Sequence, residues 1–169
     1  FKALCLFGLG DIDAAYETFH KASWSNNVIS PAMTFIAAID GARKDFDLMK
    51  KHSQTALAKE SEHAICQSYL AIAEYKLGNE SAAIRLLKEI INKDKLDHLA
   101  RFLFCHYSHT EPDTFYSLLN SNPSQTCLDL AFNLADAGLF EEAICLLEGL
   151  GKYTGMSAMA SYTLGYLYE

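Results

Sequence analysis

The sequence is poor in residues that interrupt helices, and no apolar run is long enough to cross a membrane. Only 3 of its 169 residues are proline and 9 are glycine, whereas half are hydrophobic. A bilayer span needs roughly 18 to 20 consecutive apolar residues, which no stretch approaches. The opening residues also lack the basic, apolar and small-residue zones of a secretory signal. These absences predict a packed protein of one domain, outside the membrane.

Positive charge is scarce too. The chain has 14 lysines and arginines against 21 acidic residues, a formal net charge of −7. A nucleic-acid partner is therefore not expected, because phosphate binding needs a basic face. No CxxC pair occurs, and five cysteines lie in apolar stretches: Cys5, Cys66, Cys105, Cys127 and Cys145. They predict small core side chains in a reducing compartment, most simply the cytoplasm, and no disulfide framework.

A repeated pattern runs through the chain. Three glycines, Gly10, Gly78 and Gly138, each end an apolar run, and an alanine follows five residues later. The first two alanines of this set are 68 residues apart, which is two steps of 34, and the next interval is eight residues short of two more steps. The same register is marked by large–small pairs at Ile36-Ala37, Leu70-Ala71, Phe104-Cys105, Leu130-Ala131 and Leu164-Gly165. This self-similarity predicts an all-α array of antiparallel helix pairs.

The array is expected to be a single domain over residues 1–169. Its approximate units are 1–29, 30–63, 64–97, 98–123, 124–157 and an incomplete 158–169. In the shortened unit 98–123, Thr110, Pro112 and Asp113 open a second helix with room for about two turns. Because the chain begins and ends in mid-pattern, we expect it to be a fragment of a longer protein.

Local signals support these helix boundaries. The three turn glycines are expected in the left-handed conformation, where glycine has no Cβ penalty, and Asp11 and Asn79 can cap the helices that follow. Pro31 and Pro123 are each expected at a first helical position. Close approach of helix axes is predicted at Ala15, Ala71, Ala83, Ala131, Ala143 and Gly165. A bulky side chain at such a position would overpack the contact, at ~1–3 kcal/mol.

These residues carry a family resemblance. The stretch AICQSYLAIAEYKLGNESAAIRLLKEIINKD (residues 64–94) resembles the tetratricopeptide repeat along its whole length, and CLDLAFNLADAGLFEEAICLLEGL is nearly as similar. The unit 30–63 departs from the pattern, since Lys44-Asp45 replaces Gly-Asp and Met49 and Ser53 replace the usual small and large residues. The resemblance implies a right-handed superhelical solenoid whose first helices form a concave inner wall. The last units also resemble repeat arrays attached to β-rich, carbohydrate-related domains of bacterial proteins.

In tetratricopeptide proteins the inner wall commonly holds a peptide or a helix. By register, the resemblance places these side chains on it: Thr34, Ala38, Ser68, Ile72, Tyr75, Phe102, His106, His109, Leu128, Phe132, Tyr162 and Tyr166. Some family members hold a chaperone's carboxyl terminus with basic side chains on the inner wall, and no basic residue occupies the matching positions here. The wall is apolar and aromatic, so the expected ligand is an apolar or aromatic segment, bound as a helix or a strand. The alternative for each residue is packing between units.

One stretch, FCHYSHTEPD, offers candidate metal ligands. His106 and His109 are three residues apart and would share a face of a helix, with Cys105 about 100° away and Glu111 in the turn beyond. Two ligands do not make a site, so no metal and no cofactor are predicted. The carboxylates of Asp11, Asp13, Glu141 and Glu142 are expected to face solvent at helix starts, where they favour the helix dipole. We therefore predict no enzyme activity.

Three functions remain open from the sequence. The first is a non-catalytic scaffold that binds a protein or peptide partner, or the rest of its own parent chain, in the groove. The second is a structural spacer or self-association module, because both ends of the array are apolar and could pair end to end as a homodimer. The third is a positioning region of a larger, carbohydrate-related bacterial enzyme. Sequence preceding residue 1 would distinguish the third from the other two.

Overall fold

The chain is built from helices. A computed structural model describes residues 1–110, 113–119 and 122–168, and across these residues it contains α-helices and one short 3₁₀ helix but no strand. The predicted all-α class is confirmed. None of the helices within this part of the chain combines the length and the apolar composition that a membrane span requires. Residues 1–86 and 87–169 form two compact units, which are described one at a time.

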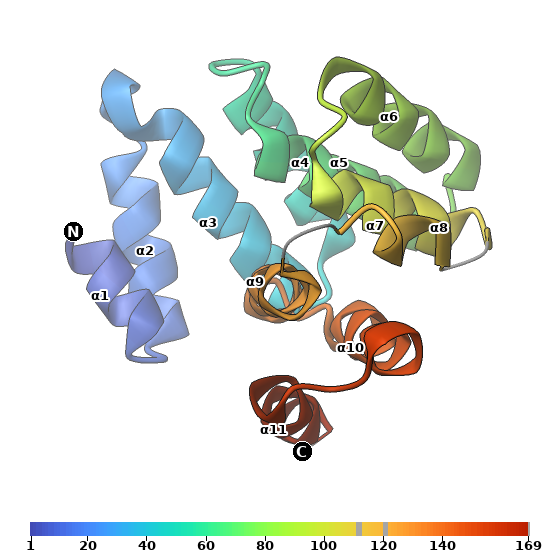
Figure 1. Cartoon of the computed structure of the whole chain (residues 1–169). Helices are drawn as coiled ribbons and strands as arrows, with labels where there is room; N and C mark the ends of the chain where they lie inside the picture. The colour runs from blue at the N-terminus through green and yellow to red at the C-terminus, as the bar shows by residue number, and fades with distance from the viewer. Residues whose placement is uncertain (111–112, 120–121, 169) are drawn as a thin grey trace. The chain divides into compact units, whose positions relative to one another are not determined.

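In the first unit, each helix packs against the next. Its segments are α1 (Lys2–Gly8), α2 (Ile12–Ala22), a 3₁₀ helix (Asn26–Val28), α3 (Ile29–Ala42), α4 (Phe46–Leu57) and α5 (Ala64–Lys76). Contacts join α1 to α2, α2 to α3, α3 to α4 and α4 to α5, and α3 also contacts α5 (Figure 1). Helix α6 (Glu80–Lys93) begins in this unit and continues into the second.

The second unit includes a much shorter helix. It contains α7 (His98–Tyr107), α8 (Asp113–Tyr116), α9 (Pro123–Asp136), α10 (Phe140–Thr154) and α11 (Ala158–Leu167). Helix α8 contacts both α7 and α10. Helices α9, α10 and α11, orange to red in Figure 1, contact one another in all three pairs.

Five turns between helices have the same backbone structure. In each, one residue has a positive φ: Gly10 (78°), Lys44 (60°), Gly78 (83°), His109 (52°) and Gly138 (67°). The N–H of that residue donates to the carbonyl three residues earlier, and the N–H of the next residue donates to the carbonyl five residues before it. This pair of bonds is the Schellman motif, which ends a helix by satisfying its last carbonyls. The left-handed conformation predicted for the three glycines is confirmed.

The helix starts agree with the predictions for Asp11 and Pro123 and differ from the prediction for Pro31. The Asp11 carboxylate accepts the Ala14 N–H at 3.3 Å, and the Asn122 side chain accepts the Gln125 N–H at 3.2 Å directly before Pro123. The prediction that Pro31 is the first residue of its helix is wrong, because α3 begins at Ile29. Proline is tolerated at this third position because the first four N–H groups of a helix have no partner within the helix.

Small residues fill the places where helices meet. Of the six predicted, five are fully buried: Ala15, Ala71, Ala83, Ala131 and Ala143. The sixth prediction, Gly165, is wrong. Gly165 is exposed on α11, and a Cβ built there would have no atom within 4 Å. Its small size is therefore not required by packing within this chain.

Helix α8 is shorter than the sequence suggested. It has four residues, about one turn, where two turns were expected. Pro112, one of the residues predicted to open this helix, lies outside the described part of the chain. The helix is nevertheless firmly packed, since Phe115 and Tyr116 are both buried. The Tyr116 hydroxyl donates to the Leu146 carbonyl of α10 at 2.8 Å. A single turn thus contacts α10 through Tyr116 and α7 through Phe115.

Candidate functional site

The predicted groove residues lie mainly on the first helix of each pair. Eleven of the twelve are on α3, α5, α7, α9 or α11. The exception is His109, which follows the end of α7 at Tyr107 and adopts the left-handed conformation of the turn. The prediction that His106 and His109 share a helix face is therefore wrong. The chain turns at the residue where the helix would have continued.

Burial divides these twelve residues. Six are buried: Thr34, Ala38, Ser68, Ile72, Phe102 and Leu128. Tyr75 and His106 are half-buried, and His109, Phe132, Tyr162 and Tyr166 are exposed. Thr34 shows what the buried members do. Its hydroxyl donates to the Ser30 carbonyl at 2.8 Å and lies 3.3 Å from the Cys66 sulfur on α5, so it connects two helices.

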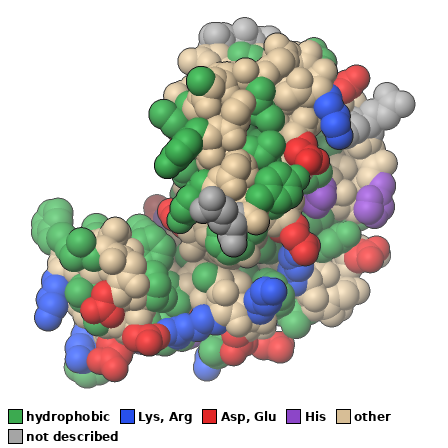
Figure 2. Space-filling model, turned by 90° about the horizontal axis from the view of Figure 1, so that it is seen from below, with side chains coloured by type: hydrophobic (Ala, Val, Ile, Leu, Met, Phe, Trp, Pro, Cys, Tyr) green, Lys and Arg blue, Asp and Glu red, His purple; other side chains and the backbone are tan. Residues whose placement is uncertain are grey.

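Three exposed aromatic side chains lie on two contacting helices. Phe132 on α9 is 49% exposed, and Tyr162 and Tyr166 on α11 are 75% and 66% exposed. The two tyrosines are four residues apart and therefore share one face of their helix. Because α9 and α11 contact each other, we treat these three residues together as the aromatic surface. Figure 2 shows that hydrophobic side chains lie open on one face of the protein.

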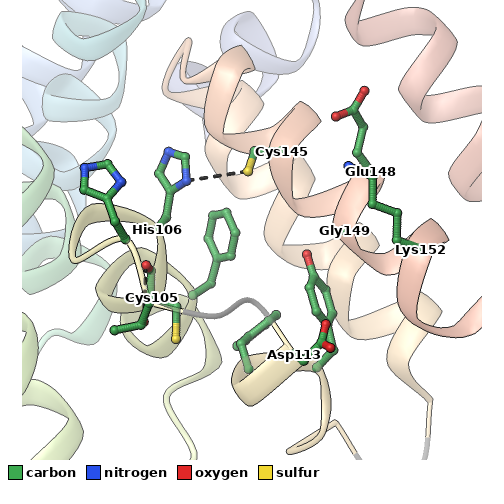
Figure 3. Close-up of a pocket in the computed structure, with 12 residues that line it drawn as sticks. Cys105, His106, Asp113, Cys145, Glu148, Gly149 and Lys152 are labelled. Carbon is green, nitrogen blue, oxygen red and sulfur yellow. Dashed lines mark hydrogen bonds between the residues drawn. The ribbon is translucent and has the colours of Figure 1, made fainter.

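A pocket of about 430 Å³ lies between α7, α8 and α10. We call it the His106–Cys145 pocket (Figure 3). It is lined by Phe102, Cys105, His106, His109, Thr110, Asp113, Phe115, Tyr116, Cys145, Glu148, Gly149 and Lys152. Three of these were predicted groove residues. The members from α10 were not predicted, because they are more than 35 residues from α7 in sequence and nothing in their spacing connects the two helices.

The central polar contact of this pocket is between an imidazole and a thiol. His106 Nδ1 lies 3.5 Å from Cys145 Sγ, and the imidazole stacks on the Phe102 ring with 5.6 Å between centroids. Burial raises the pKa of the Cys145 thiol, and the nearby Glu148 carboxylate raises it further. The thiol is therefore protonated near neutral pH, whereas a nucleophilic cysteine needs the opposite shift. The geometry gives no support to thiol catalysis.

The other ionisable groups at the pocket do not form a metal site. In the stretches that the structure describes, no three His, Cys, Asp or Glu side chains are close enough to share an ion. Glu148 accepts a hydrogen bond from the Tyr168 hydroxyl at 2.6 Å. Burial raises the pKa of the Tyr116 hydroxyl above its ordinary value, so that hydroxyl stays protonated and donates to α10. The charged side chains of Asp113, Glu148 and Lys152 share the pocket wall with aromatic ones.

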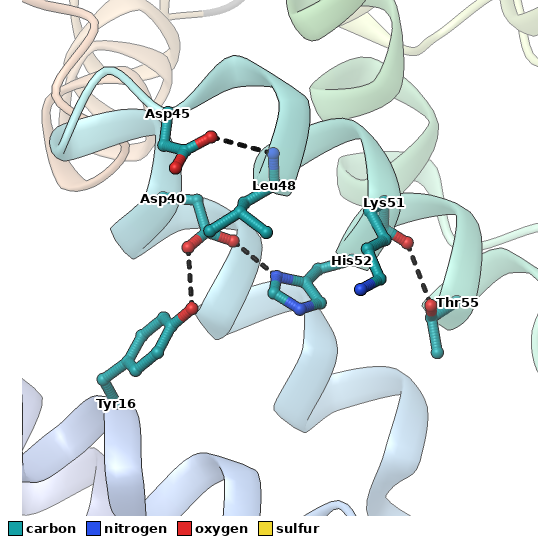
Figure 4. A network of polar contacts seen from close by, with 7 residues as sticks. All are labelled: Tyr16, Asp40, Asp45, Leu48, Lys51, His52 and Thr55. Atoms are coloured by element: carbon teal, nitrogen blue, oxygen red, sulfur yellow. Dashed lines mark hydrogen bonds and ion pairs between the residues drawn. The ribbon is translucent and has the colours of Figure 1, made fainter.

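A second polar cluster, in the first unit, was missed from the sequence. The buried Asp40 carboxylate of α3 accepts the Tyr16 hydroxyl at 3.0 Å and lies 2.6 Å from His52 Nδ1 (Figure 4). Burial and the adjacent Asp40 raise the pKa of Tyr16 to about 12. The cluster ties α2, α3 and α4 together. The sequence feature that could have revealed the cluster is Asp40, a lone acid within the apolar run ISPAMTFIAAIDGA.

One predicted surface carboxylate is also buried. Glu142, at the start of α10, is 2% exposed, and its carboxylate accepts the Tyr107 hydroxyl at 3.3 Å. The prediction that it faces solvent is wrong, because the first turn of α10 packs its third residue inward. Asp11, Asp13 and Glu141 are exposed as predicted.

Comparison with protein-family models finds none that matches this sequence, and comparison with curated proteins finds no similar chain.

Proposed function

We propose that this chain is a tetratricopeptide-like array that binds a protein partner and has no chemistry of its own. The observation that carries the proposal is the aromatic surface: Phe132, Tyr162 and Tyr166 stay exposed on two contacting helices although half of the predicted groove is buried. Exposed aromatic side chains on neighbouring elements are typical of protein-binding surfaces. The fitting partner presents an apolar or aromatic segment, as a helix or a strand.

The repeat assignment rests on the regular turns. The left-handed residues Gly10, Lys44 and Gly78 are 34 residues apart, and the same two hydrogen bonds form in each turn. A fixed period of this length with one helix pair per period is the pattern of the tetratricopeptide family. A cytoplasmic location belongs to the same proposal, because all five cysteines are free thiols.

Affinity capture with matched variants tests the binding role. Wild-type chain, Phe132→Glu and Phe140→Glu are immobilised and incubated with lysate of the source cells. Phe140 is the matched control, since it is 48% exposed on α10 and outside the aromatic surface. A partner held by wild type and Phe140→Glu but lost from Phe132→Glu supports the proposal. Equal retention by all three proteins contradicts it.

Self-association is the second candidate, and a specific observation favours it. Helix α1 and the turn that follows it expose two leucines, Leu4 and Leu9. Helix α11 exposes Tyr162 and Tyr166, so both helices offer apolar surface for pairing. Sedimentation analysis between low and high micromolar concentration separates the two functions. A mass that rises with concentration for wild type but not for Tyr162→Glu/Tyr166→Glu indicates that the aromatic surface pairs two copies. A constant monomer mass excludes self-association under these conditions and favours the partner-binding role.

A further inference from the structure

The short helix α8 has a pocket on each side. One is the His106–Cys145 pocket, and the other lies between α6, α7 and α8 with a volume of about 510 Å³. Phe115 lines both. The helices after the other Schellman turns, α2, α4, α6 and α10, have 11 to 15 residues, whereas α8 has four. Helix α8 therefore covers less of α7 than a full helix would, and space beside it stays open.

The charged residues that line the second pocket are basic, and we call it the basic pocket. Lys88 of α6 and Arg101 of α7 line it, and no acidic residue is among the described residues that do so. Within the part of the chain that the structure describes, neither cation forms an ion pair. The described lining of this pocket therefore holds two cations and no acid, in a chain with a net charge of −7.

Both cations lie next to apolar surface. Lys88 Nζ is 5.6 Å from the centre of the Phe104 ring, a cation–π distance. Arg101 Nε donates to the Lys95 carbonyl, which fixes the guanidinium while its remaining N–H groups stay available. Phe115 is buried beneath the pocket and Leu118 is 41% exposed at its edge. A ligand here would meet cationic side chains from α6 and α7 together with aromatic and aliphatic carbon.

We propose that the basic pocket binds an amphipathic organic anion, a carboxylate or phosphate ester joined to an apolar or aromatic body. Arginine and lysine bind such anions through charge-assisted hydrogen bonds, and arginine can make two in parallel. The volume lies within the range of small-molecule sites. None of the residues lining the basic pocket belongs to the aromatic surface or to the other predicted groove residues, so this activity is separate from partner binding.

Ligand titration by NMR tests the proposal with four probes of similar shape. The ¹⁵N-labelled chain is titrated with 3-phenylpropionate, phenyl phosphate, the neutral 3-phenylpropanamide and the cationic 3-phenylpropylamine. The two anions should shift the amides of Lys88, Arg101 and Leu118 saturably, with a Kd on the order of 1 mM for ligands of this size. The tighter of the two identifies the anionic group. The neutral and cationic probes, and inorganic phosphate alone, should bind at least tenfold more weakly.

Variants separate the pocket from general charge effects. Lys88→Gln/Arg101→Gln should weaken binding of the anions at least tenfold, whereas the control Lys51→Gln/Lys59→Gln, which removes the same charge from exposed sites in the first unit, should not. Thr114→Trp fills the pocket from an exposed position and should block binding with both cations intact. Equal binding of the neutral amide, absence of saturable shifts, or unchanged binding in both Lys88→Gln/Arg101→Gln and Thr114→Trp overturns the proposal.

Discussion

Two residues hold a backbone conformation that their side chains disfavour. Lys44 and His109 occupy the left-handed position of their Schellman turns. The other three turns have glycine at that position. For a residue with a Cβ this conformation costs about 1–2 kcal/mol, partly offset by the greater freedom of glycine in the unfolded chain. Lys44→Gly should therefore raise the free energy of unfolding by about 0.5–1 kcal/mol. Urea denaturation measures this change.

The reverse substitution is the control. Gly10 has a φ of 78° and no atom within 4 Å of the position of an added Cβ, so Gly10→Ala tests conformation without packing. It should lower the free energy of unfolding by about 1 kcal/mol. If Lys44→Gly were destabilising while Gly10→Ala behaved as expected, the Lys44 side chain would be contributing contacts that outweigh its backbone strain.

The imidazole of His20 makes stability depend on pH. Burial lowers its pKa from the ordinary 6.5, and the neighbouring His52 lowers it further, while Asp40 acts in the opposite direction. The folded chain therefore binds this proton less readily than the unfolded chain, and stability falls as pH drops through 6.5 toward the folded pKa. Urea midpoints between pH 8 and pH 5 should show this loss, and His20→Gln should reduce it. An unchanged slope in the variant would assign the pH dependence to another group.

Residue-level prediction succeeded where chemistry alone decides the conformation. Gly10, Gly78 and Gly138 could be assigned because glycine is the residue that enters the left-handed region without penalty. Lys44 was recognised only as a departure from glycine, and His109 was expected on a helix face, since only the surrounding helices force these two residues into the left-handed region. Asp40 and Glu142 were likewise missed as buried acids, because a partner tyrosine from another helix is what makes their burial tolerable.

The attachment of α8 to α10 depends on a glycine. A Cβ at Gly149 would lie 2.1 Å from the Tyr116 hydroxyl oxygen and 2.7–2.8 Å from two carbons of its ring. Tyr116 is buried and hydrogen-bonded, so it has no space to move away. Gly149→Ala should therefore destabilise the chain by about 1–3 kcal/mol, as overpacking of a filled site does. Thermal and urea unfolding measure the loss.

A second helical glycine is the control for this prediction. Gly165 lies within α11 with no atom near the position of its missing Cβ. Gly165→Ala should be neutral or should stabilise the helix by about 0.5–1 kcal/mol through helix propensity. Equal effects of the two substitutions would show that Tyr116 does not restrict Gly149, and that α8 packs differently from this description.

Helix existence was more predictable than helix length. The period of 34 identified the pairs, because apolar spacing and turn residues repeat along the chain. The start of α3 was misplaced because proline is allowed anywhere in the first turn, so Pro31 does not mark one residue. The single turn of α8 was not foreseen, because its packing depends on residues distant in sequence: Tyr116 contacts α10, and Phe115 contacts Phe102 of α7.

At the scale of the whole molecule, the aromatic surface is expected to be dispensable for folding. Phe132 is half exposed, so Phe132→Glu should change the free energy of unfolding by less than about 0.5 kcal/mol, as surface substitutions usually do. Helical content by circular dichroism and the Tm should match wild type. A large loss of stability would instead place Phe132 in the packed interior and remove it from the binding account.

The sequence located the candidate surface only in part. Register placed eleven of twelve residues on α3, α5, α7, α9 or α11, but it could not separate core-facing from open positions, because residues of both kinds are apolar along these helices. Thr34 and Ile72 proved to be buried, whereas Tyr162 and Tyr166 are exposed. The His106–Cys145 pocket could not be predicted without the fold, since α7 and α10, which line it, are distant in sequence.

The most direct test of the binding account is site-specific photo-crosslinking. A benzoyl-phenylalanine is placed at Tyr162, in the aromatic surface, or at the matched exposed position Phe140, and the chain is irradiated in lysate of the source cells. The account predicts a crosslink to a different protein from position 162 and none from position 140. Equal crosslinking from both positions, or a crosslink from position 162 only to a second copy of the chain, would contradict it.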